Sequence, residues 1–354
     1  MGNSKIYSKI SYSREFENSL RPVIERYPAG KIFLATEERV NEIWISKYES
    51  FFSNLGIKKV VVPSGEHNKK IESAGKIWTF LSQNGADRKS LLINIGGGML
   101  TDLAGFAATT FKRGIDFVNI PTTLLSQVDA SVGGKTGINF NGLKNEVGTF
   151  KEPLAVIINT DFLQTIDRKN FISGFAEMIK HGLIHSPGHL DELKAFDFDT
   201  IDYDKLQEII GHSVEIKTYF VANDLTEKNI RKALNFGHTV GHAIESLAME
   251  QQRPVLHGYA VAYGMLAELF LSHKMYDFPQ KELEDLTLWI LNIYGKLDVS
   301  KDDFERLFEL MTHDKKNDAG RINFTLLPKI GEIKINQNCD KELIFSSLDF
   351  FRNL

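Results

Sequence analysis

The first 160 residues alternate short apolar runs with amphipathic stretches, and this alternation constrains the fold more than any other feature of the chain. The apolar runs are rich in isoleucine and valine and end in glycine, proline or threonine, as buried strands of a parallel sheet do. They are KIFLAT (31–36), KKVVVP (58–63), SLLINIGGG (90–98), IDFVNIP (115–121) and AVIINT (155–160). Between them, residues 39–56 and 71–85 have helical spacing and stop at glycine. Strands and helices in this order predict an α/β domain with a parallel sheet.

From about residue 171 the apolar residues recur with a helical period. The exception is RINFTLLPKIGEIKI (321–335), which we expect to form a hairpin around Pro328 and Gly331. We therefore predict an α/β protein with a Rossmann-like parallel-sheet domain at 1–170 and a mainly α-helical domain at 171–354. The active site is expected in the cleft between the two domains.

Charge and composition exclude several classes of function. The net charge of −4 offers no overall basic field for nucleic acid. Cys339 is the single cysteine, which excludes an intrachain disulfide and fits a reducing compartment. The opening residues lack the apolar run of a signal peptide, and no uncharged apolar run approaches the roughly 18 residues of a membrane span. We expect a soluble cytoplasmic protein that binds neither nucleic acid nor membrane.

The stretch VDASVGGKTGIN (128–139) contains GGKT, the ending of a nucleoside-triphosphate P-loop. A P-loop also needs a glycine five positions before its second conserved glycine. Counting back from Gly134 reaches Asp129, a carboxylate where phosphates would have to approach. The spacing therefore excludes a P-loop, and the stretch must serve another purpose.

A glycine-rich turn follows the third predicted strand, in INIGGGMLTDLAGF (93–106). Backbone N–H groups at such a turn, helped by the positive end of the helix that follows, can hold a pyrophosphate. The dinucleotide fingerprint G-x-G-x-x-G is incomplete, because Thr101 stands where the third glycine belongs. The turn is equally consistent with a tight strand-to-helix connection. The acidic Asp102 favours contact with a ribose or a nicotinamide amide over contact with phosphate.

Two histidines, His238 and His242, are spaced four apart on one predicted helix face. Thr239 stands where a zinc protease needs glutamate, so a peptidase is excluded. His257 lies at a predicted helix start, and Glu177 lies in a mostly apolar stretch. A glutamate and two histidines make a three-ligand zinc site with an open position, the catalytic kind. Each histidine alone fits a structural or solvated role better, so the hypothesis requires these stretches to meet in space.

These segments together resemble the 3-dehydroquinate synthase family of sugar phosphate cyclases. The matching stretches are SGEHNK (64–69), GGGMLTDLAGF (96–106), FKRGIDFVNIPTTLLSQVDASVGGKTGIN (111–139), GLKNEVGTF (142–150), FAEMIKHG (175–182), NFGHTVGHAIE (235–245), HGYAVAYGM (257–265) and HDKKNDAGRINFTLL (313–327). Many members read HGE where this chain reads His257-Gly258-Tyr259, which leaves the histidine in place.

The resemblance implies NAD binding by the first domain and metal and substrate binding by the second. The residues it implies for NAD are Ser64, Gly65, Glu66, His67, Asn68, Lys69, Gly98, Met99, Leu100, Thr101, Asp102, Thr122, Thr123, Lys135, Lys144, Phe162, Leu163, Gln164 and Thr165. It implies Glu177, His238 and His257 as ligands of Zn²⁺ or Co²⁺. Those it implies for substrate binding and catalysis are Arg113, Asp129, Lys135, Asn145, Lys180, Lys217, Arg231, Asn235, His242, Lys315 and Lys316. It also implies a homodimer in which Arg113 reaches the neighbouring subunit's site.

The implied reaction belongs to the shikimate pathway. It converts 3-deoxy-D-arabino-heptulosonate 7-phosphate to 3-dehydroquinate and phosphate through transient oxidation at C5 by NAD, phosphate elimination, re-reduction and aldol closure. One alternative is a sister cyclase acting on a sugar phosphate without a carboxylate, such as sedoheptulose 7-phosphate. Others are a metal-dependent polyol dehydrogenase and an inactive relative that binds nucleotide. Arg231, Lys217 and the Lys315–Lys316 pair suit a carboxylate, which favours 3-dehydroquinate synthase.

Overall fold

The computed structural model describes residues 9–141, 143–312 and 322–353. The chain divides into two compact units. The first unit contains residues up to 166 together with 202–214, and the second contains 167–201 together with 215–354.

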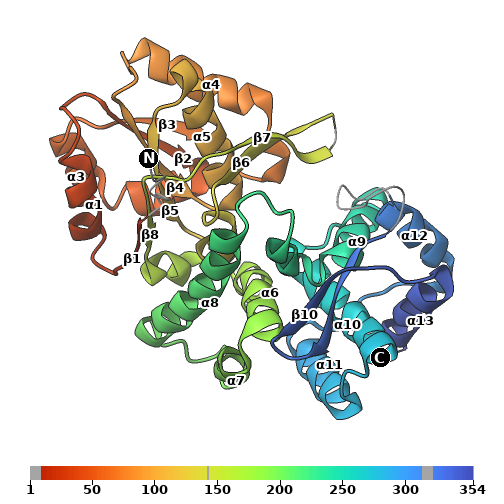
Figure 1. The fold of residues 1–354 in the computed structure, drawn as a ribbon. Helices are drawn as coiled ribbons and strands as arrows, with labels where there is room; N and C mark the ends of the chain where they lie inside the picture. The colour runs from red at the N-terminus through yellow and green to blue at the C-terminus, as the bar shows by residue number, and fades with distance from the viewer. Residues whose placement is uncertain (1–8, 142, 313–321, 354) are drawn as a thin grey trace, which may run out of the picture. The chain divides into compact units, whose positions relative to one another are not determined.

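A six-stranded sheet forms the centre of the first unit (Figure 1). Its strands pair in the order β1-β8-β5-β4-β2-β3, and each neighbouring pair is parallel. The strands are β1 (Lys9–Tyr12), β2 (Ile32–Glu37), β3 (Lys58–Val62), β4 (Leu91–Gly96), β5 (Asp116–Pro121) and β8 (Ala155–Ile158). The five predicted strands and the parallel sheet are confirmed. The edge strand β1 was not predicted, because KISY is short and carries no long apolar run.

Helices cover both faces of this sheet. They are α1 (Phe16–Ile24), α2 (Glu38–Val40), α3 (Glu49–Asn54), α4 (Ile71–Gln83) and α5 (Gly98–Thr110), with short helical turns at η1 (Asn41–Ile45), η2 (Glu66–Asn68), η3 (Phe111–Arg113), η4 (Ser126–Ala130) and η5 (Thr160–Thr165). The stretch 39–56, predicted as one helix, is interrupted by the π-helical turn η1 between α2 and α3.

The alternation of side chains along the central strands builds two separate cores. In β4, Ile93 packs with residues of α1, η1 and α3 on one face, while its neighbour Leu92 packs with residues of α4 and α5 on the other. Successive residues of a strand point to opposite faces, so a strand covered on both faces is mostly apolar. All six residues of β4 are buried, and its one polar side chain, Asn94, donates a hydrogen bond to Asn119 in the neighbouring strand.

A two-stranded antiparallel hairpin, β6 (Lys135–Phe140) and β7 (Leu143–Phe150), also belongs to the first unit (Figure 1). It begins directly after Gly133 and Gly134, whose positive φ angles of 103° and 68° suit glycine. The GGKT stretch thus leads into a strand, whereas a P-loop leads into a helix. The hairpin was not predicted.

The second unit is mainly helical. Its elements are α6 (Arg168–His185), α7 (Pro187–Lys194), the C-terminal part of α8 (Tyr203–Asn223), η6 (Ile230–Asn235), α9 (His238–Glu250), α10 (His257–Tyr276), α11 (Gln280–Tyr294), η7 (Lys301–Asp303), α12 (Phe304–Thr312), β9 (Phe324–Lys329), β10 (Glu332–Gln337) and α13 (Lys341–Arg352). The predicted hairpin is confirmed as β9–β10, which turns at Gly331.

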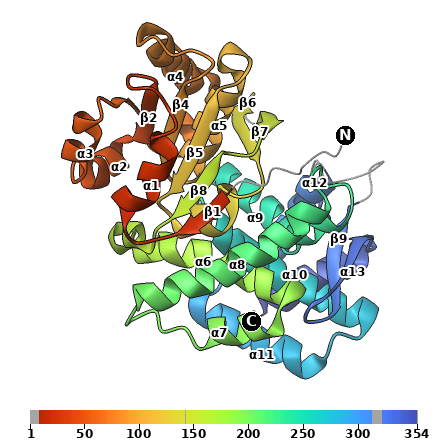
Figure 2. The same cartoon turned by 60° about the vertical axis from the view of Figure 1, so that its left-hand side comes forward.

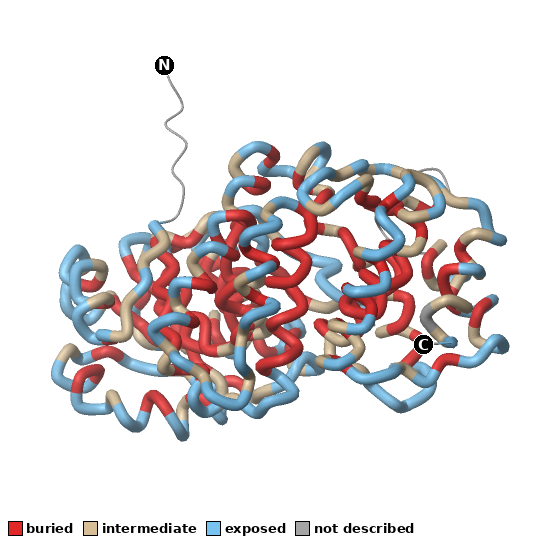
Figure 3. Tube along the Cα trace, turned by 90° about the horizontal axis from the view of Figure 1, so that it is seen from below, coloured by how far each residue is buried: buried red, intermediate tan, exposed pale blue. Residues whose placement is uncertain are grey.

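Helix α10 is the centre of this unit and packs against α6, α9 and α13 (Figure 2). It is buried along most of its length, and Figure 3 shows buried residues concentrated inside each unit. Among the helices of the described residues, none combines the length and the apolar character needed to cross a membrane.

Candidate active site

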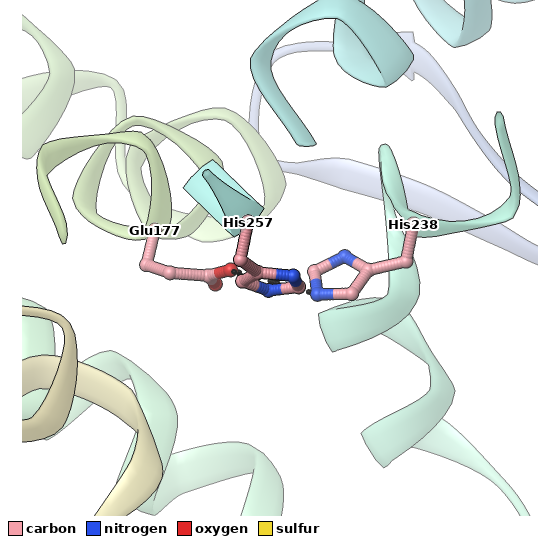
Figure 4. A group of neighbouring side chains, drawn as sticks. All are labelled: Glu177, His238 and His257. Atoms are coloured by element: carbon pink, nitrogen blue, oxygen red, sulfur yellow. Dashed lines mark ion pairs between the residues drawn. The ribbon is translucent and has the colours of Figure 1, made fainter. Parts of the chain in front are cut away.

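Three helices of the second unit bring a carboxylate and two imidazoles together (Figure 4). Glu177 lies in the middle of α6 and is fully buried, while His238 and His257 are the first residues of α9 and α10. The Nε2 atoms of His238 and His257 lie 3.5 Å and 3.4 Å from the same oxygen, Oε1 of Glu177. The three stretches that the sequence analysis required to meet therefore do meet.

These separations fit ligands of one small cation better than they fit hydrogen bonds. A good N–H···O hydrogen bond spans about 2.7–3.2 Å. Two ligand atoms bonded to one tetrahedral zinc ion at about 2.1 Å would lie about 3.4 Å apart. One glutamate and two histidines are also a donor set that Zn²⁺ and Co²⁺ accept.

In both imidazoles, the atom that faces Nδ1 favours the tautomer with its proton on Nδ1. His238 Nδ1 lies 3.1 Å from the carbonyl oxygen of Phe236, and His257 Nδ1 lies 3.4 Å from Oε2 of Glu245. A carbonyl or carboxylate oxygen only accepts, so each Nδ1 must donate a proton. The Nε2 lone pair of each neutral ring then faces Glu177, as in carboxylate–histidine–metal arrangements.

Lys180 holds the other oxygen of the same carboxylate. It lies one helical turn after Glu177, and its Nζ forms an ion pair with Oε2 while both side chains are almost completely buried. Oε1 is thereby left facing the two imidazoles. A buried charge requires such a partner.

The acidic surroundings also raise the pKa of His257 when no cation competes. Burial alone would lower this pKa, but the polar contacts with the carboxylates of Glu177 and Glu245 and their negative charges outweigh burial and raise it to about 9. A divalent cation would have to displace this proton, so its binding is coupled to pH.

Two glycines of α10 allow the three helices to pack closely against one another. A Cβ atom on Gly258 would lie 1.7 Å from the backbone oxygen of Ser173 in α6, and one on Gly264 would lie 1.9 Å from that of Gly237. The amide of Gly258 also donates to Ser173 Oγ at 3.0 Å. Gly258 and Gly264 therefore let α10 approach the two segments that carry Glu177 and His238.

Further residues implied for the substrate lie in the same unit. The ring of His242 lies 5.3 Å from that of His238 and 5.9 Å from that of His257, centre to centre. Lys217 and Arg231 are both buried, with 5% and 3% of their surface exposed. Buried cations suit recognition of an anionic ligand in a protein whose overall charge is negative. Lys315 and Lys316 lie outside the described residues.

An acidic loop before η6 orders the segment that carries Arg231 and Asn235. The carboxylate of Asp224 accepts the backbone N–H groups of Lys228, Asn229 and Arg231 at 2.6–3.2 Å. Burial would raise the pKa of Asp224, but these hydrogen bonds and the charge of Arg231 lower it below its usual value. Asn235 Nδ2 donates to Glu227 Oε1 at 2.9 Å. The sequence analysis named neither Asp224 nor Glu227, although both fall in the run of polar residues before Arg231.

The first unit has its own polar cluster, beyond the carboxyl end of β3. Lys69 Nζ lies 2.6 Å from Asp102 Oδ2 and 2.5 Å from Asn145 Oδ1, and the lysine is 4% exposed. Burial would lower the pKa of Lys69, but the charges of Asp102 and Glu66 outweigh it and raise the pKa. Glu66 accepts from Asn139 Nδ2 at 2.9 Å. Two segments implied for NAD, those of Glu66 with Lys69 and of Asp102, are thus brought together with Asn145, which was implied for the substrate.

A carboxylate that the sequence analysis missed lies at the glycine turn. Glu37 ends β2, and its Oε1 accepts the N–H of Gly97 at 3.0 Å. The chain leaves β2 toward β3 on one side and leaves β4 toward β5 on the other, so this contact lies where the strand order reverses. Open parallel sheets bind nucleotides at this position. The sequence feature that could have indicated Glu37 is its position, as an acidic residue directly after the predicted strand at 31–36.

The other implied residues occupy several kinds of position. Thr122 and Thr123 follow β5, and Ser64, Gly65, His67 and Asn68 follow β3. Met99 and Thr101 lie in the first turn of α5, which begins at Gly98. Leu100, Phe162 and Leu163 are buried. Gln164 Nε2 donates to Asp161, Thr165 Oγ1 accepts from Trp44, Asp129 is half-buried in η4, and Arg113, Lys135 and Lys144 are exposed.

Solved structures with this fold include two enzymes that cover nearly the whole chain. A 2-epi-5-epi-valiolone synthase from Streptomyces hygroscopicus, with NAD⁺ and Zn²⁺ bound, has a TM-score of 0.84 at 20% identity and covers 100% of this chain and 99% of its own. A 2-deoxy-scyllo-inosose synthase complexed with carbaglucose-6-phosphate, NAD⁺ and Co²⁺ has a TM-score of 0.83 at 23% identity, with coverages of 97% and 96%. The chain shares the fold of these two synthases.

Sequence relationships assign the chain to one family. The family models for the 3-dehydroquinate synthase N-terminal and C-terminal regions match residues 59–173 and 174–317. A 3-dehydroquinate synthase of Parabacteroides distasonis is 49% identical over 344 residues, which is 97% of this chain and 98% of that protein. The chain belongs to the 3-dehydroquinate synthase family.

Proposed function

We propose that this protein is a 3-dehydroquinate synthase, a lyase that converts 3-deoxy-D-arabino-heptulosonate 7-phosphate to 3-dehydroquinate and phosphate. The observation that carries the proposal is the group of the buried Glu177 with His238 and His257, whose ligand atoms have the separations of a three-ligand cation site. It occurs in a chain that is 49% identical to a 3-dehydroquinate synthase over almost its entire length.

Glu177, His238 and His257 would hold Zn²⁺ or Co²⁺, and the polar cluster around Lys69 with the turn at Gly98–Asp102 would contribute to holding NAD. When bound, NAD would supply reversible hydride acceptance at C5 of the substrate, and the divalent cation would polarise the oxygen at that carbon. The two sets of residues belong to different units, so we assign NAD binding to the first unit and cation binding to the second.

The chain's own groups would bind and orient the anionic substrate. Lys217 and Arg231 are buried cations that can pair with a carboxylate or a phosphate, and the planar guanidinium can make two parallel hydrogen bonds to either. Lys180 holds Oε2 of Glu177 and so keeps Oε1 directed at the histidines. His242 lies beside both histidines, and an imidazole is the side chain best suited to moving a proton near neutral pH.

Phosphate release tests the proposal. The purified protein would be mixed with catalytic NAD, Zn²⁺ and the seven-carbon keto-acid phosphate, with parallel reactions containing sedoheptulose 7-phosphate or a chelator. We expect chelator-sensitive phosphate release from the keto-acid alone, with no lasting NADH. Release from the neutral sugar phosphate would instead assign the protein to a sister cyclase, and accumulating NADH would assign it to the polyol dehydrogenases.

The alternative of a cyclase that acts on a substrate without a carboxylate is less consistent with the sequence relationships, because a relative that is 49% identical over 97% of this chain is a 3-dehydroquinate synthase. Our earlier expectations of a homodimer and a cytoplasmic location remain predictions; light scattering of the purified protein would test the first.

A further inference from the structure

A second glutamate, Glu268, is completely buried in α10, eleven residues after the histidine that begins the helix. Its Oε2 accepts the backbone N–H of Gly237 at 2.8 Å. Gly237 has a positive φ of 78° and immediately precedes His238. This carboxylate is therefore directed at the backbone that leads into the candidate metal ligand.

The conformation of Gly237 leaves little freedom around this hydrogen bond. A Cβ atom at Gly237 would lie 2.6 Å from Cγ of Met265 and 2.9 Å from the backbone oxygen of Val261. On its other side, the backbone oxygen of Gly237 would lie 1.9 Å from a Cβ on Gly264. The peptide between Phe236 and Gly237 is thus confined by α10.

That single peptide group connects Glu268 with His238. Its N–H, on Gly237, donates to Glu268 Oε2 at 2.8 Å, and its C=O, on Phe236, lies 3.1 Å from Nδ1 of His238. A peptide whose N–H is hydrogen-bonded to an acceptor has a more polarised carbonyl, since hydrogen bonds in a chain strengthen one another. The carbonyl then holds the Nδ1 proton more firmly, and Nε2 becomes a better electron donor.

We propose that Glu268 is a positioning residue for the cation site, acting on His238 through the Phe236–Gly237 peptide group. The other imidazole, His257, has a carboxylate directly on its Nδ1, that of Glu245. For His238 the carboxylate is that of Glu268, and the Phe236–Gly237 peptide group lies between the two. Each histidine ligand is thereby supported by a glutamate, one directly and one through the backbone.

The test measures Co²⁺ binding rather than turnover. Glu268→Met removes the acceptor at similar volume, and Glu268→Gln keeps an acceptor oxygen but changes the carboxylate to an amide. We expect Co²⁺ affinity to fall about 10- to 100-fold in the methionine variant and about 3- to 10-fold in the glutamine variant. The visible absorption of bound Co²⁺ should change in both variants, because the orientation and donor strength of one ligand change.

Ser272→Ala is the matched control, because Ser272 is also fully buried, lies one turn further along α10, and donates to the backbone oxygen of Glu268 while accepting the N–H of Leu327. It should lower the thermal stability without changing Co²⁺ affinity or absorption. If the methionine variant does not fold, the glutamine variant decides. A glutamine variant with wild-type Co²⁺ affinity and spectrum would overturn the inference.

The inference rests on the proposed cation site, and the two can fail separately. If the wild-type protein binds no Co²⁺, both the cation site of the proposed function and this inference are wrong. If the wild-type protein binds Co²⁺ and the Glu268 variants bind it equally well, only the role of Glu268 is wrong.

Discussion

Gly258→Ala is expected to disable the cation site by separating two helices. The new Cβ would lie 1.7 Å from the backbone oxygen of Ser173, far inside the distance at which such atoms come into contact. The first turn of α10 would have to move away from α6 by more than about 1 Å, because the obstacle is backbone and has no rotamer to change. Overpacking of this kind costs about 1–3 kcal/mol.

Two further losses follow from the same displacement. The hydrogen bond from Gly258 N–H to Ser173 Oγ, 3.0 Å long, would break and contribute about 1 kcal/mol more. Glu177 lies one turn after Ser173 on α6, and His257 directly precedes Gly258, so their separation of 3.4 Å would also grow. A cation bound at about 2.1 Å from each ligand cannot bridge a gap widened by 1 Å without losing its geometry.

We therefore expect Gly258→Ala to lower the free energy of unfolding by about 2–4 kcal/mol and to weaken Zn²⁺ binding at least about 100-fold. Chemical denaturation and competition with a chromophoric chelator would measure the two effects. Gly188→Ala in α7 is the matched control, because its Cβ would meet nothing within 4 Å, and it should change the free energy of unfolding by less than about 1 kcal/mol. Wild-type Zn²⁺ affinity in Gly258→Ala would refute the argument that this close approach sets the ligand spacing.

Three other predictions follow from the same unit. Lys217→Ala should raise KM for the keto-acid phosphate at least about tenfold by removing a charge-assisted contact, while metal content measured by atomic absorption stays the same. Asp224→Asn should also raise KM and leave Zn²⁺ affinity unchanged, because an amide cannot accept all three backbone N–H groups that hold the loop before Arg231; unchanged steady-state kinetics would contradict this. In the metal-free protein, the raised pKa of His257 should contribute stability that is present near pH 6.5 and is lost as the pH rises through about 9. The loss should be up to about 3 kcal/mol, and thermal melts of His257→Gln should lack it.

Much of the first unit could be predicted because a sheet covered on both faces leaves a simple pattern in sequence. The strand at 91–96 is buried at every position, and its long apolar run predicted it directly. The β6–β7 hairpin gives no such pattern, because β7 is exposed at nearly all of its positions. Its partner β6 buries only a short central part, which includes Ile138, so neither strand has the long apolar run that predicted the strands of the sheet.

The candidate ligands could be named from residue types and a family resemblance, but their arrangement could not. The spacing of His238 and His242 places both on one face of α9 and does not say which of them faces Glu177. The helix crossing decides this: α10 approaches α9 closely, and the N-terminal ends of both helices face the middle of α6. As a result, Nε2 of His257 lies 3.4 Å and Nε2 of His238 lies 3.5 Å from Oε1 of Glu177.

The supporting carboxylates were hidden from the sequence for a related reason. Glu245 and Glu268 are 12 and 31 residues away from the groups they contact, which is outside any helical spacing rule. These contacts form because glycines let the helices approach backbone to backbone. In the sequence, a glycine within a helix indicates only a low helix propensity. The sequence and the family resemblance could thus name candidate ligands of a cation. The helix contacts at Gly237, Gly258 and Gly264 determine how those atoms are held, and substitution at these glycines should damage the site as much as the loss of a ligand does.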